Sequence, residues 1–563
     1  MQDDILSTKK QIADLLFPNI ANGVEHDRNY FETERLKLLE IRKFDVRMST
    51  GYETLRVAPS PTGFPHIGLV YMALISSKIA KQTNGTFCLR IEDTDSLREM
   101  EGAREIIIDT LSDYNIKYDE YYVQSERVDQ YKAFAFEMVK LGHAYPCFIT
   151  KEELDGLREI QNANKIRPGI YGKYATNRNL SFEEIQNKLI SGEKFVLRMM
   201  ASGNIENKNK FIDEFLGEHM IPENDEDFVL LKSDGIPTYH FAHVVDDYLL
   251  GTTFVTRAEE WWSSLPKHLA LWDALKLNRP KYGHIMPINK TEQKTLEDGS
   301  IKNIVRKLSK RKDPEASMSF YREQGYLSEA VTAYLYRLAN PNFDEWFTEN
   351  VSDKKREALK IDDYVLNMDE MKRGSRGPLL DFVKLNNISS DIVANMSFVD
   401  IAQKVLTWSK TNDIDFYNVI SKDVLFLERV LNIERNTENP RKDIYKWSVA
   451  KENIFYFFDE LFEAEKMIGE NLTDEEKDVI KVFANKIEEK GWDDCMISLE
   501  VWMNKMKEIH TEIISENEKY KDKKFGAIMM LLRKSITKRE KTPNLYFIFQ
   551  ALGKNTVLSR LNL

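Results

Sequence analysis

Apolar residues follow two different periods along this chain, and the change between them predicts two kinds of structure. In residues 86–91 apolar and polar side chains alternate, which is typical of a β-strand. In 69–79 and 101–111 apolar side chains recur every three or four positions, which predicts helices. Strands that alternate with helices in this way indicate an α/β fold with a sheet of mainly parallel strands.

This alternation is interrupted and then resumes. Between 144 and 226 the sequence is charged and helix-rich, with one short strand expected at 195–198, and we interpret it as an insertion. Short apolar runs at 228–231, 244–245 and 254–255 then predict further strands of the sheet. Because open α/β sheets bind ligands where their strands end, the residues after these strands are candidate site residues.

The second half of the chain has the helical period almost throughout. From residue 314 onward apolar spacing predicts helices, for example at 327–338, 425–433 and 454–462. Residues 287–307, just before it, are polar and include Asp298-Gly299, so we expect a loop there. The first 50 residues are polar and helix-prone, and they show no candidate chemistry.

Length and composition place the chain among globular proteins of several domains. With 563 residues it needs about three to five cores, and 42% hydrophobic and 30% charged residues are ordinary proportions. No apolar run approaches the roughly 18 residues of a membrane helix, and the start resembles neither a secretory signal nor a transit peptide. Three well-separated cysteines favour a reducing compartment, so we expect a cytoplasmic protein.

The net charge of -11 argues against a nucleic-acid partner, but net charge bears on solubility more than on local binding. Basic residues gather at 306–312 and at 519–541. The second cluster alternates with the apolar run 527–532. It therefore fits an amphipathic helix with a solvated basic face as well as it fits a nucleic-acid contact.

Two short stretches carry the strongest candidate chemistry. His66 and Gly68 stand at the expected start of a helix, where free N–H groups and the helix dipole favour a phosphate. Residues 307–311 place three cations and a hydroxyl within five positions, which suits a mobile clamp on a triphosphate. Either stretch alone is weak evidence, because a lone His-Ile-Gly is commonly chance and a short basic run is usually a solvated face.

Acidic and polar residues follow the expected strands. Glu92, Asp93 and Asp95 come directly after 86–91 and could bind a metal, bind an amine or simply face water. Arg257 precedes two glutamates, an arrangement that is most often a surface ion-pair network. In a cleft, however, a guanidinium is the best bidentate partner for a carboxylate.

Together and in this order, these stretches resemble the two signatures of class I aminoacyl-tRNA synthetases, and their surroundings resemble glutamyl-tRNA synthetases. The resemblance rests on Arg-Val-Ala-Pro-Ser-Pro-Thr-Gly before His-Ile-Gly, on Leu-Arg-Ile-Glu-Asp-Thr-Asp after it, on Pro-Thr-Tyr with Val-Val-Asp-Asp, and on Arg-Ala-Glu-Glu-Trp. It is strong over about 53–385 and continues at lower density to the C-terminus. Glutaminyl relatives would be expected to show Pro-Glu-Pro at 59–61.

The resemblance implies an α/β Rossmann-type catalytic domain with an α+β insertion, followed by an all-α C-terminal half that binds the anticodon. The expected parts are an N-terminal extension (1–50), the first half of the catalytic domain (51–143), an acceptor-stem-binding insertion (144–226), the second half with the Lys-Leu-Ser-Lys-Arg loop (227–313), a helical stem-contact domain (314–385) and an α-helical anticodon-binding domain (386–563).

The resemblance also implies the activity, which is ATP-dependent attachment of L-glutamate to the 3′ end of tRNA(Glu) through a glutamyl-adenylate. Mg²⁺ would accompany ATP, and the enzyme is expected to be a cytoplasmic monomer without a membrane partner. One alternative is a non-discriminating enzyme that also charges tRNA(Gln) with glutamate, which the catalytic motifs do not separate. Another is a non-catalytic protein that binds tRNA or nucleotide on the same fold. The intact His66, Gly68, Lys307 and Lys310 argue against the latter.

The resemblance also assigns roles to individual residues of this chain by their position in the family motifs. Glu92 would hold the α-amino group of glutamate and Arg56 its side-chain carboxylate, in a pocket formed by Arg56, Ala58, Ser60, Glu92, Tyr239, His243 and Arg257. ATP would meet Thr62, His66, Gly68, Glu260 and Lys310. The catalytic residues would be His66, Lys307, Ser309 and Lys310. Separately, the dense positive charge of residues 519–541 predicts tRNA contacts at Lys534, Lys538, Arg539 and Lys541.

Three departures from the family pattern matter. His243 stands where a residue such as Asn is usual, and protonation of its imidazole could enter the pH profile. The stretch before Lys307 looks longer than usual. Many members hold zinc through a Cys-x-Cys pair, whereas here Cys147 stands alone. Because one thiol does not make a tetrahedral zinc site, we expect no bound metal and consider zinc unlikely.

We therefore expect the purified protein to contain no stoichiometric zinc, as measured by elemental analysis. About one zinc per chain, lost on Cys147→Ser substitution, would contradict this expectation. A zinc content that the substitution leaves unchanged would place the metal on other side chains.

Overall fold

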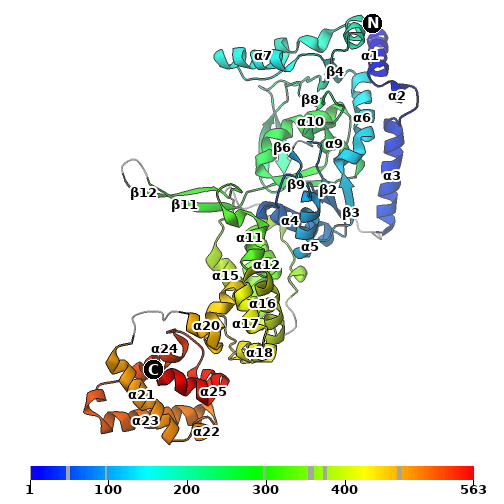
Figure 1. Cartoon of the computed structure of the whole chain (residues 1–563). Helices are drawn as coiled ribbons and strands as arrows, with labels where there is room; N and C mark the ends of the chain where they lie inside the picture. The colour runs from blue at the N-terminus through cyan, green and yellow to red at the C-terminus, as the bar shows by residue number, and fades with distance from the viewer. Residues whose placement is uncertain are drawn as a thin grey trace. The chain divides into compact units, whose positions relative to one another are not determined.

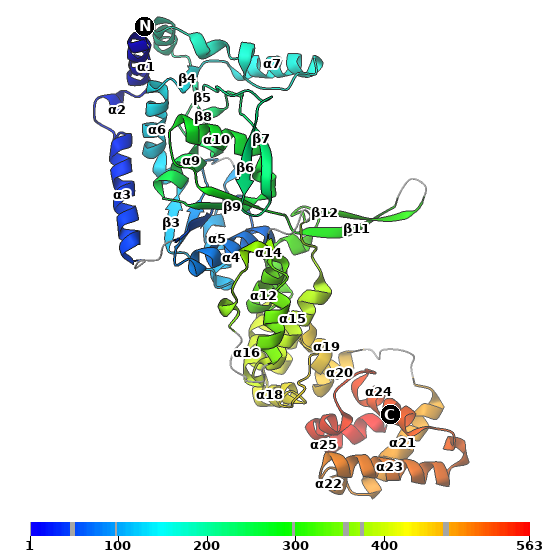
Figure 2. The ribbon, with the colours of Figure 1, turned by 180° about the vertical axis from the view of Figure 1, so that it is seen from behind.

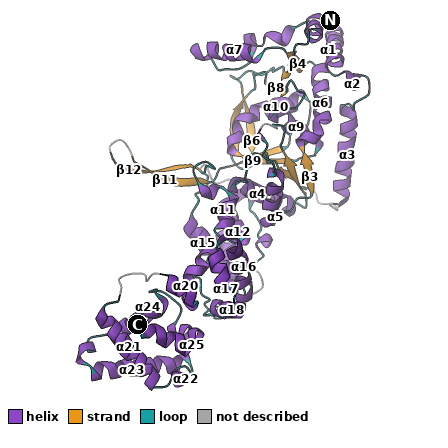
Figure 3. Ribbon diagram, viewed as in Figure 1, coloured by secondary structure: helices purple, strands orange, loops and turns teal. Residues whose placement is uncertain are grey.

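The computed structural model describes residues 2–45, 51–95, 98–295, 299–352, 360–371, 377–465 and 472–562 (Figure 1). The chain divides into two compact units, which we describe one at a time. The first consists of Met1–Phe320, Leu335–Glu345 and Asp362–Leu380, and the second of Tyr321–Tyr334, Trp346–Ile361 and Asp381–Leu563. Every strand of the described residues belongs to the first unit (Figure 3).

Parallel strands form the centre of the first unit. One sheet has the order β1-β2-β3, and a second parallel pair, β9 and β10, adjoins β1 through a hydrogen bond from Thr253 N to Thr54 O (3.0 Å). The strands are β1 (Thr54–Val57), β2 (Thr86–Ile91), β3 (Glu120–Val123), β9 (Phe254–Ala258) and β10 (Lys281–Ile285). The accompanying helices are α4 (Ile67–Gln82), α5 (Ala103–Asp113), α6 (Val128–Lys140), α9 (Tyr239–Leu249) and α10 (Leu265–Ala274). The predicted Rossmann-type α/β fold is confirmed.

One strand predicted after the insertion is a helix, and another is a strand of a different sheet. Residues 244–245 lie inside α9, and β8 (Val229–Leu231) pairs antiparallel with β5 rather than joining the parallel sheet. α9 is buried on nearly every side, so its short apolar run cannot be told from a strand by periodicity. The error matters because α9, not a strand, carries Tyr239 and His243.

The inserted region combines small sheets with short helices. This region has a three-stranded antiparallel sheet of order β4-β5-β8 and a separate hairpin of β6 and β7. The elements are β4 (Ala144–Cys147), α7 (Lys151–Ala163), α8 (Phe182–Ile190), β5 (Val196–Met199), β6 (Lys208–Asp213) and β7 (Gly217–Pro222). Capping boxes begin both helices, with Thr150 paired to Glu153 and Ser181 to Glu184.

The loop predicted at 287–307 is instead an antiparallel ribbon of β11 (Asn289–Thr295) and β12 (Ile301–Lys307), which projects from the unit in both views (Figures 1 and 2). Leu296–Asp298, which include part of the expected turn, lie outside the described residues. The prediction failed because both faces of the ribbon are largely polar, so no apolar alternation marked it. Its signal was Asp298-Gly299, a common dipeptide of hairpin turns.

The first residues belong to the core of the first unit. α1 (Gln2–Leu16), α2 (Pro18–Ala21) and α3 (Arg28–Asp45) precede β1, and α1 and α3 contact α6 (Figure 1). Ile12 and Phe31 are buried with residues of α6 and α9. Arg42 donates from Nη1 to Leu250 O (2.6 Å) and from Nε to Glu120 Oε1 (2.9 Å). The helical extension therefore holds the carboxyl end of α9.

The second unit is helical. Its buried aliphatic and aromatic side chains form one core. The helices predicted at 327–338 and 425–433 are α12 (Ser328–Ala339), of which 328–334 belong to this unit, and α18 (Val424–Asn432). The further long helices are α15 (Phe382–Asn395), α16 (Phe398–Asn412), α17 (Ile414–Ile420), α21 (Asp474–Glu489), α23 (Leu499–Glu516), α24 (Phe525–Thr537) and α25 (Leu545–Leu561).

The helix predicted at 454–462 is broken. α19 (Ala450–Ile454) ends before a short 3₁₀ turn, and α20 (Asp459–Ala464) follows Phe458, whose backbone is extended. The aromatic side chains of 455–458 are all buried, and burying consecutive residues requires the backbone to leave the regular helix. Among the described helices, none combines the length and the hydropathy that a bilayer span requires.

We expect Arg42→Leu to lower the free energy of unfolding by about 2 kcal/mol, because it leaves buried acceptors without their donor. Urea denaturation would measure the change. Lys37→Leu is a matched control, since Lys37 lies exposed on the same helix and, among the described residues, forms an ion pair with Glu34 alone. Equal losses in the two variants would contradict a specific role for Arg42.

Candidate active site

A cleft of about 720 Å³ opens where the parallel strands of the first unit end. Arg56 belongs to β1, Glu92 follows β2, Arg257 belongs to β9, and Tyr239 is the first residue of α9. The structure thus brings together most of the side chains predicted to bind glutamate, with one predicted for ATP: Arg56, Ala58, Ser60, Thr62, Glu92, Tyr239 and Arg257.

Arg56 is held from behind by α9. Its Nε donates to Asp247 Oδ1 (2.9 Å), its Nη1 to Thr256 O (3.3 Å), and its Nη2 lies 3.3 Å from His243 Nδ1. The side chain is nearly all buried, yet it lines the cleft. These contacts fix the plane of the guanidinium and leave it facing the cavity.

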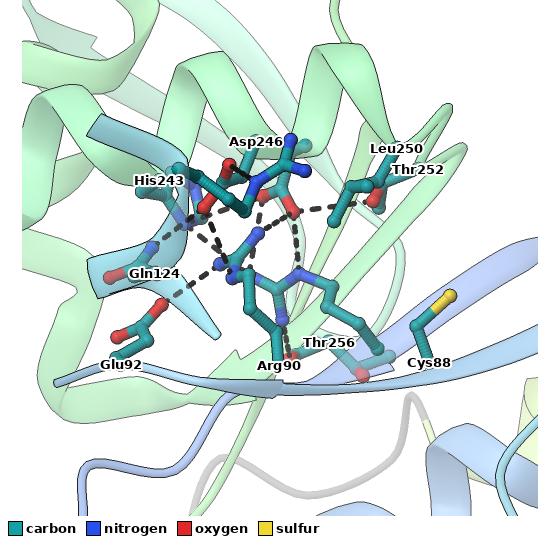
Figure 4. Close-up of polar contacts among 12 residues, drawn as sticks. Cys88, Arg90, Glu92, Gln124, His243, Asp246, Leu250, Thr252 and Thr256 are labelled. Carbon is teal, nitrogen blue, oxygen red and sulfur yellow. Dashed lines mark hydrogen bonds and ion pairs between the residues drawn. The ribbon is translucent and has the colours of Figure 1, made fainter. Parts of the chain in front are cut away.

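Arg90, which no sequence pattern marked as a candidate, supports the wall of the cleft. It is fully buried, with Nη1 donating to Asp247 Oδ1 (2.8 Å) and Nη2 to Glu92 Oε1 (2.9 Å). Figure 4 shows Arg90, Glu92 and His243 turned toward one another below α9. Burial raises the pKa of Glu92, while the Arg90 cation opposes that effect. A charged residue inside an apolar strand was the available signal.

A second carboxylate on α9, Asp246, has its own set of partners. Arg127 Nε donates to its Oδ1 (2.7 Å), and Gln124 Nε2 (2.9 Å) and Tyr131 Oη (2.7 Å) donate to its Oδ2. Asp246 has no exposed surface. Adjacent buried carboxylates are tolerated here because each receives several charged or polar hydrogen bonds.

Arg257 is held at two edges by histidines. Its Nε donates to His284 Nε2 (2.9 Å), and its Nη1 lies 2.8 Å from His268 Nδ1. The guanidinium also lies over the ring of Tyr282, 5.0 Å from its centroid. Its buried Nη2 has no hydrogen-bond partner within the described part of the chain. No sequence pattern marked the two histidines, because both lie outside the recognised motifs.

His243 lies behind Arg56 rather than in the lining of the cleft. It has no exposed surface, and its ring stacks on that of His268 with centroids 4.2 Å apart. Burial and the neighbouring arginines hold the pKa of His243 well below its usual value. Its imidazole is therefore neutral near pH 7, which answers the question the sequence left open about its protonation.

His66 and Gly68 begin α4 together. His66 Nδ1 accepts a hydrogen bond from Gly68 N (2.9 Å), which caps the first turn of the helix. Burial, aided by the cations of Lys310 and Lys307, lowers the pKa of His66 to about 4. A neutral imidazole at the positive end of the helix dipole is suited to a neighbouring phosphate.

The basic segment after β12 lies close to His66. Lys307 forms an ion pair with Glu260, and Ser309 N donates to Asp313 Oδ2 (2.9 Å), which fixes the turn. Lys310 is exposed and has no hydrogen bond or ion pair among the described residues. The structure therefore brings His66, Glu260 and both lysines to one place and leaves Lys310 available.

Family models match both halves of the chain. The model described as "tRNA synthetases class I (E and Q), catalytic domain" matches residues 54–369, and the "Anticodon binding domain" model matches 449–563. The Glutamate--tRNA ligase of Clostridium perfringens is 39% identical over 98% of this chain and 100% of its own length. The chain belongs to the glutamate–tRNA ligase family.

Other relatives agree with this membership. The Glutamate--tRNA ligase of Clostridium beijerinckii is 38% identical over 98% of this chain and 99% of its own. A crystal structure of the glutamate-tRNA synthetase of Elizabethkingia anophelis has a TM-score of 0.66 at 25% identity, over 91% of this chain and 99% of that one. The family resemblance and the fold class indicated by the sequence are confirmed.

The candidate tRNA contacts lie in the second unit, and three of the four bind within it. Lys534 pairs with Glu540 (2.8 Å). Lys538 Nζ donates to Glu465 O (2.7 Å), and Arg539 lies over the ring of Phe455 at 4.3 Å. Lys541 is the exposed member of the set. The first three side chains stabilise the fold, and tRNA binding by this segment stays a prediction.

No group of three or more His, Cys, Asp or Glu side chains in the described ranges is arranged to hold a metal ion. Cys147 is buried in β4. The expectation that zinc is absent stays a prediction, to be decided by the metal content of the protein.

We expect the KM for glutamate to vary by less than about twofold between pH 6.5 and 8, because buried neutral histidines do not titrate there. Burial and nearby cations lower the pKa of His243 and His268 well below the usual value, and that of His240 to about 3. Initial rates of glutamate activation against pH would measure this.

The same histidines predict a stability effect in acid. Below about pH 6.5 the unfolded chain binds protons on them and the folded chain does not, so stability falls as the pH falls.

A KM profile with an inflection near pH 6.5, absent in His243→Asn, would contradict the neutral state of this cluster.

Proposed function

We propose that this chain attaches L-glutamate to the 3′ end of tRNA(Glu) with ATP, through a glutamyl-adenylate. The observation that carries the proposal is the cleft itself. Arg56 and Arg257 are two cations held rigidly at its wall, and Glu92 is an acid beside them. This charge pattern is complementary to an amino acid with two carboxylates and one ammonium.

The pocket has a place for each group of glutamate. Glu92 receives a hydrogen bond from Arg90 and lies beside the cleft, where it would hold the α-ammonium. Arg56 would pair with the side-chain carboxylate and Arg257 would support a carboxylate through its free Nη2. Tyr239 and the backbone near Ala58 and Ser60 would complete the lining, and His243 would act through Arg56.

The first chemical step would join the two halves of the site. A carboxylate oxygen of glutamate attacks the α-phosphorus of ATP, and pyrophosphate leaves with its electron pair. Thr62, His66 and Gly68 would position the phosphates at the start of α4, with Glu260 beside the nucleotide. Lys310 would meet the charge that develops, while Lys307 and Ser309 shape its loop. Mg²⁺ would accompany the phosphates.

The second step would transfer the acyl group. The terminal ribose hydroxyl of tRNA attacks the acyl carbon of the adenylate, and AMP leaves. Neither step needs a covalent enzyme intermediate, which agrees with a site of cations and N–H groups. Catalysis of this type consists mainly of positioning and charge stabilisation.

The C-terminal half would recognise the tRNA. The match of 449–563 to an anticodon-binding domain supports this role. Residues 314–385 would contact the tRNA stem and 144–226 the acceptor stem, and we propose a monomer working in the cytoplasm. The relatives named glutamate–tRNA ligase support tRNA(Glu) as substrate, and additional charging of tRNA(Gln) is the second candidate.

A charging assay with purified tRNA(Glu) and tRNA(Gln), ATP and each of glutamate and glutamine tests the proposal. We expect ligation of glutamate to tRNA(Glu), and the tRNA(Gln) arm decides whether the enzyme discriminates. Absence of any glutamate-dependent AMP formation, with and without tRNA, would leave a protein that binds tRNA or nucleotide without catalysis.

We expect Lys310→Ala to lower adenylate formation by on the order of 10²–10³, because one preorganised charge contact to the transition state is lost. Affinity for tRNA should be nearly unchanged, as a filter-binding titration would measure. Lys312→Ala is a matched control, since Lys312 is exposed two positions away and outside the motif. Near-normal turnover of Lys310→Ala would remove this loop from the mechanism.

A further inference from the structure

Arg257 is one member of a chain of buried side chains that ends in the inserted region. Asp213 Oδ2 lies 2.6 Å from His284 Nδ1, and Arg257 Nε lies 2.9 Å from His284 Nε2. On its other edge, Arg257 Nη1 lies 2.8 Å from His268 Nδ1, whose Nε2 lies 3.1 Å from His240 Nδ1. Asp213, His284 and His268 have at most 1% of their surface exposed.

The direction of each hydrogen bond follows from chemistry. Arginine only donates, so His284 must accept at Nε2, and its single proton then lies on Nδ1. That proton is donated to Asp213, which as a carboxylate only accepts. The carboxylate therefore selects the one tautomer of His284 that can receive a hydrogen bond from Arg257.

The turn that carries Asp213 is docked on the strand that carries His284. Glu214 N donates to Tyr282 O (2.8 Å), and the Phe215 ring lies against Gly283, where an added Cβ would come within 2.6 Å of it. In the parallel pair of β9 and β10, His284 is directly opposite Arg257. The β6–β7 hairpin thus contacts β10, and β10 pairs with β9, which carries Arg257 at the wall of the cleft.

Asp213 is fixed as firmly as the residue it holds. Its Oδ1 accepts from the N–H groups of Phe215 (3.0 Å), Leu216 (2.9 Å) and His284 (3.1 Å). Burial would raise the pKa of Asp213, but the hydrogen bonds from His284 and Leu216 prevail and lower it. The carboxylate is therefore ionised at neutral pH.

We propose that Asp213 is a positioning residue for the amino-acid substrate. Through His284 it orients the guanidinium of Arg257, so that Nη2 meets a substrate carboxylate. A side chain of the insertion thereby sets the affinity of the catalytic cleft for glutamate. This inference rests on the proposed role of Arg257 and assigns a new residue to it.

Asp213→Asn isolates the effect. The amide oxygen can keep the backbone N–H groups, and the amide nitrogen then faces His284 Nδ1 and forces its proton onto Nε2. Two donors, His284 Nε2 and Arg257 Nε, would then meet. We expect a rise of roughly tenfold in the KM for glutamate, as for loss of one hydrogen bond to a charged group. The KM for ATP and kcat should stay within about twofold.

Asp227→Asn is the matched control. Asp227 is an equally buried aspartate of the same inserted region, but its partners are Tyr145, Arg178 and Ala201 N, away from the cleft. We expect it to lose stability without a selective rise in the KM for glutamate. A purely structural role of Asp213 would move both variants alike and would lower kcat and ATP affinity together.

Arg257→Ala separates this inference from the proposed function. If Arg257→Ala leaves the KM for glutamate unchanged, the proposed pocket is wrong. If Arg257→Ala raises the KM for glutamate and Asp213→Asn does not, the proposed pocket is supported and the positioning role of Asp213 is wrong.

A second pair of variants covers the case in which Asp213→Asn does not fold. His284→Gln keeps one donor and one acceptor at similar spacing, whereas His284→Leu keeps neither. We expect His284→Gln to keep a KM for glutamate close to that of the parent protein, and His284→Leu to raise it. Equal KM values for the two variants would overturn the proposal.

Discussion

Asp247 receives hydrogen bonds from two arginines on neighbouring strands, Arg56 and Arg90, and the cleft depends on this shared carboxylate. All three side chains are almost entirely removed from solvent. Removing one partner from a buried ion pair typically costs about 3–5 kcal/mol, because the remaining charge is left without compensation. The network therefore joins α9 to β1 and β2 in a single arrangement, and Glu92 and Arg56 take their positions from it.

α9 is consequently the element whose placement matters most, and distant parts of the chain hold it. Arg35 Nε donates to Tyr248 O (2.8 Å) and Arg42 to Leu250 O (2.6 Å) at its carboxyl end. Cations at a helix C-terminus interact favourably with the helix dipole and with carbonyls that lack partners. The first 45 residues, which show no chemistry of their own, thus contribute to the site by fixing the helix behind it.

The sequence predicted those parts of the site that are local in the chain. Strand, turn and helix start around His66 are contiguous, and Lys307 to Lys310 form one short segment, so the family resemblance could be recognised from these stretches. Arg90, His268 and His284 were missed because their roles arise only from packing between segments that are remote in sequence. The strand predicted at 244–245 failed for a related reason, since α9 buries its polar side chains together with its apolar ones and a short apolar run in it resembles a buried strand. The ribbon at 289–307 failed in the opposite way, because it is polar on both faces.

The neutral histidines explain how so much positive charge can select an acidic substrate. If His243 or His268 were protonated beside Arg56 and Arg257, the cleft would carry surplus cations whatever ligand it held. Burial keeps these rings neutral, so they accept hydrogen bonds from the arginines without adding charge. The cations of Arg56 and Arg257 then stay available for carboxylates. A neutral amide in the same place would leave a desolvated cation unpaired, and penalties of that kind discriminate more strongly than shape does. If the cleft holds glutamate as proposed, selection of glutamate over glutamine would follow as much from the uncharged residues behind the arginines as from the arginines themselves.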